Sequence, residues 1–465
     1  MFDSHPSDDL NSNIEHLARS FMHKCSFSTP DTVNRSSNVW AQFRGTPNED
    51  RFAISEEWRL SGHYWQFIAV FDGHGGSTTA QYLAKHFTSH LRRSMELSFS
   101  YTPESAPSPI PPSPSTLQMP SATTGDRNDL SPSPFILFTE KNISEFLRRQ
   151  VRAFDEDLGQ AVKDICPHPE LLSDKEAFEL YKNHREVIAR ARCGSTMAGI
   201  LLDKTERRMW VCCVGDSSVV LSTKSANSEK RKAVLLNRHH TPHTPQEYHR
   251  VSMAHPSQER NNIWLDGQER IFGTLSMTRA FGDFMYKFPT SFTTMLFSKF
   301  PSTAMGSVDR VLSYNRTPPY VIPDPHVTFV DLTTFNEDED PAVVIYTDGL
   351  EALADKLVMT TMAKSVSDDG SGASFFNLEV PPTAVDIIGG FLGQPANLAG
   401  LPPNLIDLFP NDNAAFDLIY NLICRAIPGK LRAHLAVKND DSIDDEDFYI
   451  DDVTVIVWRP LASEQ

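Results

Sequence analysis

Apolar positions along this chain follow two periods, one helical and one of two residues as in a strand. Helical spacing governs two long segments, Ser77–Leu97 and Ile143–Val162. Their apolar residues are Ala80, Leu83, Ala84, Phe87 and Leu91 in the first segment, and Ile143, Phe146, Leu147, Val151, Phe154, Leu158 and Val162 in the second. Ser77 is placed to cap the first of them. The pattern therefore predicts two long helices, each with one buried face.

Short apolar runs of strand length fill much of the remaining pattern. They are Phe67–Phe71, Met197–Leu202, Met209–Val214, Ser218–Ser222, Val327–Asp331, Ala342–Tyr346 and Val453–Trp458. The polar stretch Asp203–Arg208 between two of these runs predicts a hairpin. Several runs follow one another without a helical segment between them, so the sheets are expected to be mainly antiparallel. The sequence thus favours an α+β sandwich over a doubly wound parallel sheet.

One stretch departs from this periodicity. Residues 101–134 are rich in Pro, Ser and Thr and hold few large apolar side chains. Such a segment gains too little from burial to offset the entropy of ordering, so we predict a disordered insertion.

The chain has 465 residues, 40% of them hydrophobic, which is enough for a large core. We interpret residues 1–38 as an N-terminal extension and residues 39–462 as one domain that contains the insertion.

Charge and composition narrow the functional classes. Lys and Arg number 43 against 60 Asp and Glu, a net charge of −17 that argues against nonspecific nucleic-acid binding. No apolar run reaches the roughly 18 residues that a membrane helix needs. Six cysteines without regular spacing indicate a reducing compartment rather than a disulfide framework. The acidic, polar start lacks targeting features, so we expect the cytoplasm or nucleus, with the mitochondrial matrix as the alternative.

Three aspartates stand at the ends of apolar strand-like runs that lie far apart in the chain. Asp72 follows FIAVF, Asp348 follows VVIYT, and Asp451 precedes DVTVIVW. A carboxylate at a buried strand end needs water, a hydrogen-bond donor or a metal to receive its charge. Three of them predict one shared site for a hard cation at the edge of a sheet. The first hypothesis is therefore a metal-dependent hydrolase.

The segment FDGHGG around Asp72 adds two candidate groups. Gly73 permits close backbone approach, so its carbonyl is able to face the same cation. His74 follows, where it is placed to give a proton to a leaving group. An isolated Asp-Gly pair would be an ordinary turn, but the two other strand-end aspartates favour the metal site. The turn-rich segments Gly215–Ser217 and Thr278–Asp283 are interpreted as structural parts of a cleft rim.

Seven segments in one order carry a family resemblance. They are NEDRF, FIAVFDGHGG, CGSTMAGILL, VCCVGDSSVVL, SMTRAFGDF, VVIYTDGL and DDVTVIVW. From about Asn48 to Arg459 the chain resembles the metal-dependent serine/threonine protein phosphatases of type 2C. The spelling NEDR, and Asp452 where many members have Asn, are similar to the pyruvate dehydrogenase phosphatase-like and fungal branches.

This resemblance implies a four-layer αββα sandwich, with two mainly antiparallel sheets flanked by helices and two Mg²⁺ or Mn²⁺ ions between the sheets. It implies phosphoprotein substrates and an activated water as the nucleophile, and leaves the oligomeric state open. The implied metal ligands are Asp72, which bridges both ions, the Gly73 carbonyl, Asp348 and Asp451.

The resemblance also assigns supporting roles. Glu49 and Asp50, which alone would be an ordinary exposed pair, are implied to hold metal-bound waters. His74 is implied to protonate the departing Ser or Thr oxygen.

Two departures from the family pattern bear on the site. Members often carry a phosphate-binding Arg four residues before the first Glu, a position that is Gly45 here. Arg44, one step away, is our candidate for that role, and Arg51 is the alternative. Two aspartates associated with a weak third metal are replaced by Ala191 and Ala352, which argues against a third ion.

The sequence is also consistent with two other functional hypotheses. One is a catalytically weak pseudophosphatase that keeps the fold as a binding or regulatory module. The other is a two-metal hydrolase that acts on nucleotides or other small phosphoesters.

Overall fold

The computed structural model describes thirteen stretches of the chain, together covering most of the predicted elements. They are residues 19, 21–28, 38–43, 48–99, 138–225, 228–265, 270–300, 305–367, 382–398, 406, 409–410, 412–426 and 451–460. Arg44 and the predicted insertion at 101–134 lie outside these residues. Over the described stretches, no helix has the length and apolar character needed to cross a membrane.

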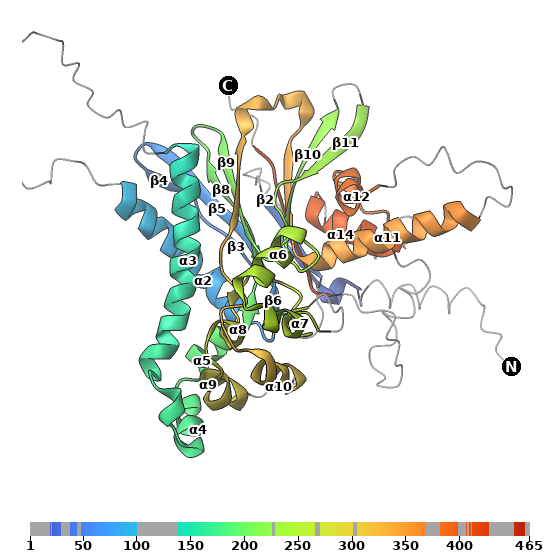
Figure 1. The fold of residues 1–465 in the computed structure, drawn as a ribbon. Coiled ribbons are helices and arrows are strands. Elements are labelled where there is room, and N and C mark those ends of the chain that lie inside the picture. The colour runs from blue at the N-terminus through green and yellow to red at the C-terminus, as the bar shows by residue number, and fades with distance from the viewer. Residues whose placement is uncertain are drawn as a thin grey trace, which may run out of the picture.

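Two six-stranded sheets form the centre of the fold (Figure 1). The first has the order β1 (Cys25–Phe27), β2 (Asn38–Phe43), β15 (Val453–Trp458), β14 (Ala342–Tyr346), β10 (Ser218–Ser225) and β11 (Ser228–Leu235). The second has the order β13 (His326–Asp331), β9 (Arg208–Val214), β8 (Met197–Asp203), β5 (His63–Phe71) and β3 (Arg51–Ile54), with β4 (Trp58–Leu60) also paired to β5.

Every strand pair in both sheets is antiparallel, as the sequence pattern predicted. The predicted hairpin is confirmed, because β8 and β9 pair directly with Asp203 opposite Arg208. β1 lies within the segment interpreted as an N-terminal extension, and it pairs with β2 at the edge of the first sheet. Part of the segment 1–38 therefore belongs to the sheet. The predicted domain limits, residues 39–462, stay a prediction.

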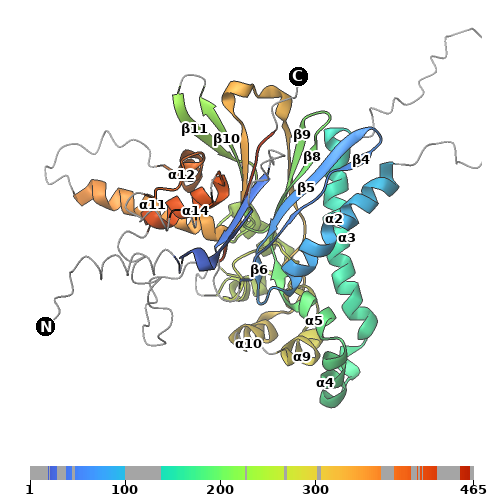
Figure 2. The same cartoon turned by 180° about the vertical axis from the view of Figure 1, so that it is seen from behind.

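Helices cover the outer face of each sheet (Figures 1 and 2). The second sheet is covered by α2 (Thr78–Phe99) and α3 (Glu140–Ile165), which are the two predicted long helices. The first sheet is covered by α11 (Asp348–Ser367), α12 (Ala384–Phe391) and α14 (Ala414–Ala426). The result is an α+β fold of four layers with two antiparallel sheets inside, which confirms the predicted class.

Helix α3 begins three residues before its first apolar position because of a cap. The Thr139 side chain accepts a hydrogen bond from the backbone N–H of Asn142 at 3.2 Å, which satisfies one otherwise unpaired donor of the first turn. Hydrophobic periodicity registers only the buried face, so it misses such a polar first turn.

Alternation along the strands divides the core into layers. In β5, Phe67 and Phe71 pack toward α2 and α3, whereas Ile68 and Val70 pack between the two sheets. Adjacent Cys212 and Cys213 in β9 likewise belong to opposite faces. Each fully buried large apolar side chain of this kind stabilises the fold by about 1.5–3 kcal/mol.

A third, small sheet and a group of short helices lie at the end of the sandwich where β5 stops, in the lower part of Figure 1. The small sheet has the order β12 (Phe281–Gly282), β7 (Gly194–Ser195) and β6 (Gly73–His74). The helices there are α4 (Asp174–Asn183), α5 (Arg185–Arg192), α6 (Pro245–Ala254), α7 (Arg260–Ile263), α8 (Phe284–Lys287), α9 (Thr290–Met295) and α10 (Met305–Tyr314).

Candidate metal centre

Three aspartates meet at this end of the sandwich. Asp72 directly follows β5, Asp216 comes two residues after β9, and Asp348 comes two residues after β14 as the first residue of α11. Strands β5 and β9 both pair antiparallel with β8, so they run in the same direction and end at the same edge. One carboxylate oxygen from each aspartate lies within 4.8 Å of the other two. The fold thus brings two predicted residues together with one that was not predicted.

The three carboxylates repel one another, and a bound cation would offset this repulsion. Burial, with the neighbouring Asp348 carboxylate adding to it, raises the pKa of Asp72 well above its ordinary value. The same two causes raise the pKa of Asp216 to about 7. The buried Oδ1 of Asp216 has no hydrogen-bond partner in the described part of the chain. Clustered carboxylate oxygens with an unsatisfied member fit a hard divalent ion such as Mg²⁺ or Mn²⁺.

Asp50 is held rigidly beside this group. Its Oδ2 accepts hydrogen bonds from the hydroxyls of Thr347 and Thr454, both at 2.8 Å. Burial raises the pKa of Asp50 to about 8, although the two threonine hydrogen bonds act in the opposite direction. The charge of Asp50 also contributes to the raised pKa of Asp72. Asp50 therefore lies within electrostatic reach of the three aspartates without being one of them.

Asp451 is not brought into the three-aspartate group. It is exposed, and its Oδ1 accepts a hydrogen bond from the backbone N–H of Asp452 at 2.9 Å. The neighbouring Asp452 is instead the buried one, and its Oδ2 accepts from the backbone N–H of Glu49 at 2.6 Å. Adjacent residues of an extended segment face opposite sides, so only one of two consecutive aspartates can face inward. The assignment of Asp451 as a metal ligand gains no support from this geometry and stays a prediction.

The small sheet places His74 against an acidic partner. His74 lies opposite Gly194 of β7, and Gly194 lies opposite Gly282 of β12, after which comes Asp283. His74 Nε2 and Asp283 Oδ2 are 2.6 Å apart. A Cβ atom at Gly194 would overlap both side chains, so glycine is required for their approach.

The environment of His74 favours its protonated form. Burial lowers the pKa of the imidazole, but the charge and hydrogen bond of Asp283 outweigh it, so the pKa lies above its ordinary value. Nε2 is taken by Asp283, whereas the buried Nδ1 has no hydrogen-bond partner in the described stretches. Nδ1 is thus the ring nitrogen that Asp283 does not hold and that has no partner among the described residues.

The sequence reasoning missed Asp216 and Asp283 as site residues. Both stand directly after a glycine in the segments that were interpreted as structural turns, Gly215–Ser217 and Thr278–Asp283. Asp216 had the same signal as Asp72, namely an acid just beyond a buried apolar strand. Asp283 had no such signal, because its role depends on pairing between three distant two-residue strands.

The two arginine candidates have different outcomes. Arg44 falls outside the described residues, so its phosphate-binding role stays a prediction. The guanidinium of Arg51 donates to Gln81 Oε1 at 3.0 Å, to Asn48 O at 3.0 Å and to Asp50 O at 2.7 Å. These contacts tie Arg51 to the protein itself, which disfavours it as the alternative.

The family model described as Protein phosphatase 2C matches residues 137–378, just over half of the chain. The chain belongs to the protein phosphatase 2C family. Its membership agrees with the resemblance noted from the seven motifs.

Individual relatives of this protein phosphatase 2C chain are distant. A protein phosphatase 2C homolog of Schizosaccharomyces pombe is 26% identical over 331 residues, covering 70% of this chain and 62% of the relative. The mitochondrial pyruvate dehydrogenase phosphatase 1 of Homo sapiens is 25% identical over 214 residues, covering 46% of this chain and 36% of the relative. The chain thus spans less than two thirds of the length of these relatives. A crystal structure of serine-threonine phosphatase 2C from Toxoplasma gondii has a TM-score of 0.43 and 12% identity, covering 94% of this chain and 98% of that one.

Proposed function

We propose that this chain is a metal-dependent protein phosphatase that hydrolyses phosphoserine and phosphothreonine in phosphoprotein substrates. The observation that carries the proposal is the meeting of Asp72, Asp216 and Asp348 beside the His74–Asp283 pair. Membership of the protein phosphatase 2C family supports it. The intact carboxylate group and proton donor favour an active enzyme over a pseudophosphatase.

Two Mg²⁺ or Mn²⁺ ions are proposed as the cofactors. Asp72, Asp216 and Asp348 would hold them, with the Gly73 carbonyl as a further oxygen ligand. When bound, such ions lower the pKa of a coordinated water toward neutrality and offset charge on phosphate oxygens.

The side chains around them have separate tasks. Asp50, whose carboxylate accepts from two threonine hydroxyls, and Glu49, whose backbone N–H donates to Asp452, would orient ordered water. His74 donates a proton from Nδ1 to the departing serine or threonine oxygen, while Asp283 holds the ring through Nε2. An alkoxide is a poor leaving group, so this proton transfer is needed for the physiological substrates.

The proposal is tested by turnover of a phosphoserine peptide with Mn²⁺, with a nucleotide assayed in parallel. We expect the wild type to release phosphate from the peptide, and Asp72→Asn and chelator-treated protein to release none above background. Activity restricted to the nucleotide would indicate a small-phosphoester hydrolase. No metal-dependent turnover of either substrate would favour the pseudophosphatase.

Replacement of His74 by alanine is expected to slow alkyl phosphates far more than aryl phosphates. A general acid contributes about 10²–10⁴-fold when the leaving group needs a proton, and an aryl oxide needs it much less. The measurement is kcat for a phosphoserine peptide and for p-nitrophenyl phosphate, in the wild type and in His74→Ala. Asp283→Asn should show the same selectivity in weaker form. Equal slowing of both substrates would remove the proton-donor role of His74.

A further inference from the structure

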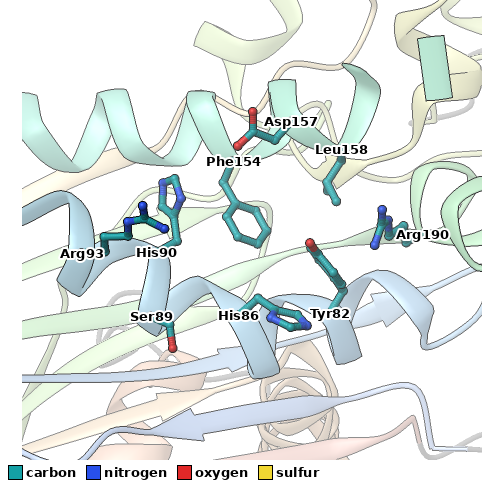
Figure 3. A pocket seen from close by; sticks show the side chains of 9 residues that line it. All are labelled: Tyr82, His86, Ser89, His90, Arg93, Phe154, Asp157, Leu158 and Arg190. Atoms are coloured by element: carbon teal, nitrogen blue, oxygen red, sulfur yellow. The ribbon is translucent and has the colours of Figure 1, made fainter. Parts of the chain in front are cut away.

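A cavity of about 300 Å³ opens between helices α2, α3 and α5, outside the metal centre. This volume is at the lower end of the roughly 300–1,000 Å³ typical of small-molecule sites. Figure 3 shows side chains from the two long helices facing each other across it. The lining residues are Tyr82, His86, Ser89, His90 and Arg93 of α2, Phe154, Asp157 and Leu158 of α3, and Arg190 of α5.

The middle of the cavity has flat, apolar walls. The rings of Tyr82 and His86 have centroids 4.4 Å apart, and those of Tyr82 and Phe154 are 5.8 Å apart. Leu158 adds an aliphatic contact on the α3 side. The Tyr82 and Phe154 rings are thus in contact with each other, and together with Leu158 they offer an apolar wall to a flat group that lies beside them.

Two arginines face the same cavity, at opposite ends in Figure 3. The guanidinium carbon of Arg190 lies 4.5 Å from the centroid of the Tyr82 ring, and its buried Nε has no hydrogen-bond partner among the described residues. Neither Arg190 nor Arg93 forms an ion pair with any residue that the structure describes. By contrast, Arg250 and Arg279 both pair with Glu247. The two guanidinium groups are thus not neutralised by a described carboxylate, and an anion in the cavity would offset their charge.

The charge balance of the lining also favours an anion. Among the described residues that line the cavity, Asp157 is the one carboxylate, against two guanidinium groups. Burial lowers the pKa of His86 and of His90, so both imidazoles are largely neutral at pH 7. The fixed charges at neutral pH therefore leave the cavity positive, in a chain whose net charge is −17.

We propose that this cavity binds a small organic anion, with its phosphate or carboxylate group at Arg190 and its flat apolar body against the side chains of Phe154 and Leu158. Guanidinium groups recognise both anions through paired, charge-assisted hydrogen bonds. Stacking of the Arg190 guanidinium on Tyr82 fixes its plane before a ligand arrives, which reduces the entropy lost on binding. The site is distinct from the metal centre and does not depend on the proposed phosphatase activity.

Calorimetric titration of phenylphosphonate and benzoate tests the proposal. The full-length Asp348→Ala protein serves as the parent, so that binding at the metal centre does not obscure the result. We expect saturable binding of at least one of the two anions, and the tighter one identifies phosphate or carboxylate as the preferred group. Arg190→Leu is expected to weaken that binding by about tenfold or more, because a charge-assisted contact is lost. Benzyl alcohol, which has the ring without the charge, should not bind saturably.

Variants at the exposed lining residues Arg93 and Asp157 test the same proposal if Arg190→Leu folds poorly. Arg93→Leu should weaken binding and Asp157→Asn should strengthen it, since each changes the charge that faces the ligand. Arg92→Leu is the matched control, because Arg92 is on the same helix but pairs with Glu96 away from the cavity. Equal affinity of Arg93→Leu, Asp157→Asn and Arg92→Leu would overturn the proposal, as would absence of saturable binding of both anions to the parent.

Discussion

Asp348→Ala is expected to lower metal-dependent phosphopeptide turnover by roughly 10³-fold or more, which corresponds to about 4 kcal/mol of lost transition-state stabilisation. Asp348 begins α11 directly beside Asp72 and Asp216, so its removal takes one of three converging carboxylates from the centre. Both proposed effects of the ions, water activation and charge neutralisation, depend on their being held there. The loss should therefore appear in kcat and in the Mn²⁺ affinity together.

Turnover of a phosphoserine peptide and calorimetric titration with Mn²⁺ measure the two effects. Asp355→Ala is a matched control, because Asp355 is an exposed acid on the same helix that lies outside the three-aspartate group. We expect that control to retain both activity and Mn²⁺ affinity. A titration of Asp348→Ala that matches the wild type would show that Asp348 is not a ligand.

Removal of divalent metal is expected to make the protein progressively less stable as the pH rises from about 6 to 8.5. In the metal-free protein, burial and mutual repulsion raise the pKa of Asp72, of Asp216 to about 7 and of Asp50 to about 8. In the unfolded chain these carboxyl groups have the ordinary aspartate pKa of 3.8. The folded state therefore binds more protons than the unfolded state at every pH between 3.8 and the raised pKa values. Stability from these groups is complete below about pH 4, falls as the pH rises further, and is gone above about pH 7 for Asp216 and about pH 8 for Asp50.

Thermal unfolding with and without Mg²⁺ checks this expectation. We expect the metal-free midpoint to fall by roughly 5–10 °C over that pH range. The stabilisation by Mg²⁺ should grow over the same range, because a cation binds the deprotonated carboxylates of the folded state. Asp216→Asn should flatten the metal-free dependence and reduce the Mg²⁺ effect. A metal-free midpoint that stays constant or rises toward pH 8.5 would contradict the proposed repulsion among these groups.

The sequence predicted where each aspartate stands relative to its strand. It predicted only two of the three aspartates that meet in the folded protein. Asp72 and Asp348 were identified because apolar runs lead directly to them. Asp216 has the same relation to β9, but its glycine-rich turn was interpreted as purely structural. Asp451 was chosen over Asp452, but which of two consecutive acids faces inward depends on the register of β15 against β2 and β14, which the sequence does not give.

The contact between His74 and Asp283 was even less predictable from the sequence. His74 stood out beside Asp72, but nothing in the local pattern connected it to Asp283, 209 residues away. Their contact is created by two-residue strands that are too short to leave a periodic signal. The cavity between α2, α3 and α5 was equally hidden, because the helical periodicity reports the buried face of each helix and not the gap between neighbouring helices.

The sequence by itself determined the two-period pattern, and with it the antiparallel sandwich, the two long helices and the strand-end position of the acids. These features follow from local spacing, because burial of one face requires apolar residues at the period of the element. Only the tertiary structure decided that Asp216 joins Asp72 and Asp348, that Asp452 rather than Asp451 faces Glu49, and that Asp283 holds His74. Such contacts join elements distant in the chain, and their geometry depends on sheet register and helix packing, which local spacing does not encode.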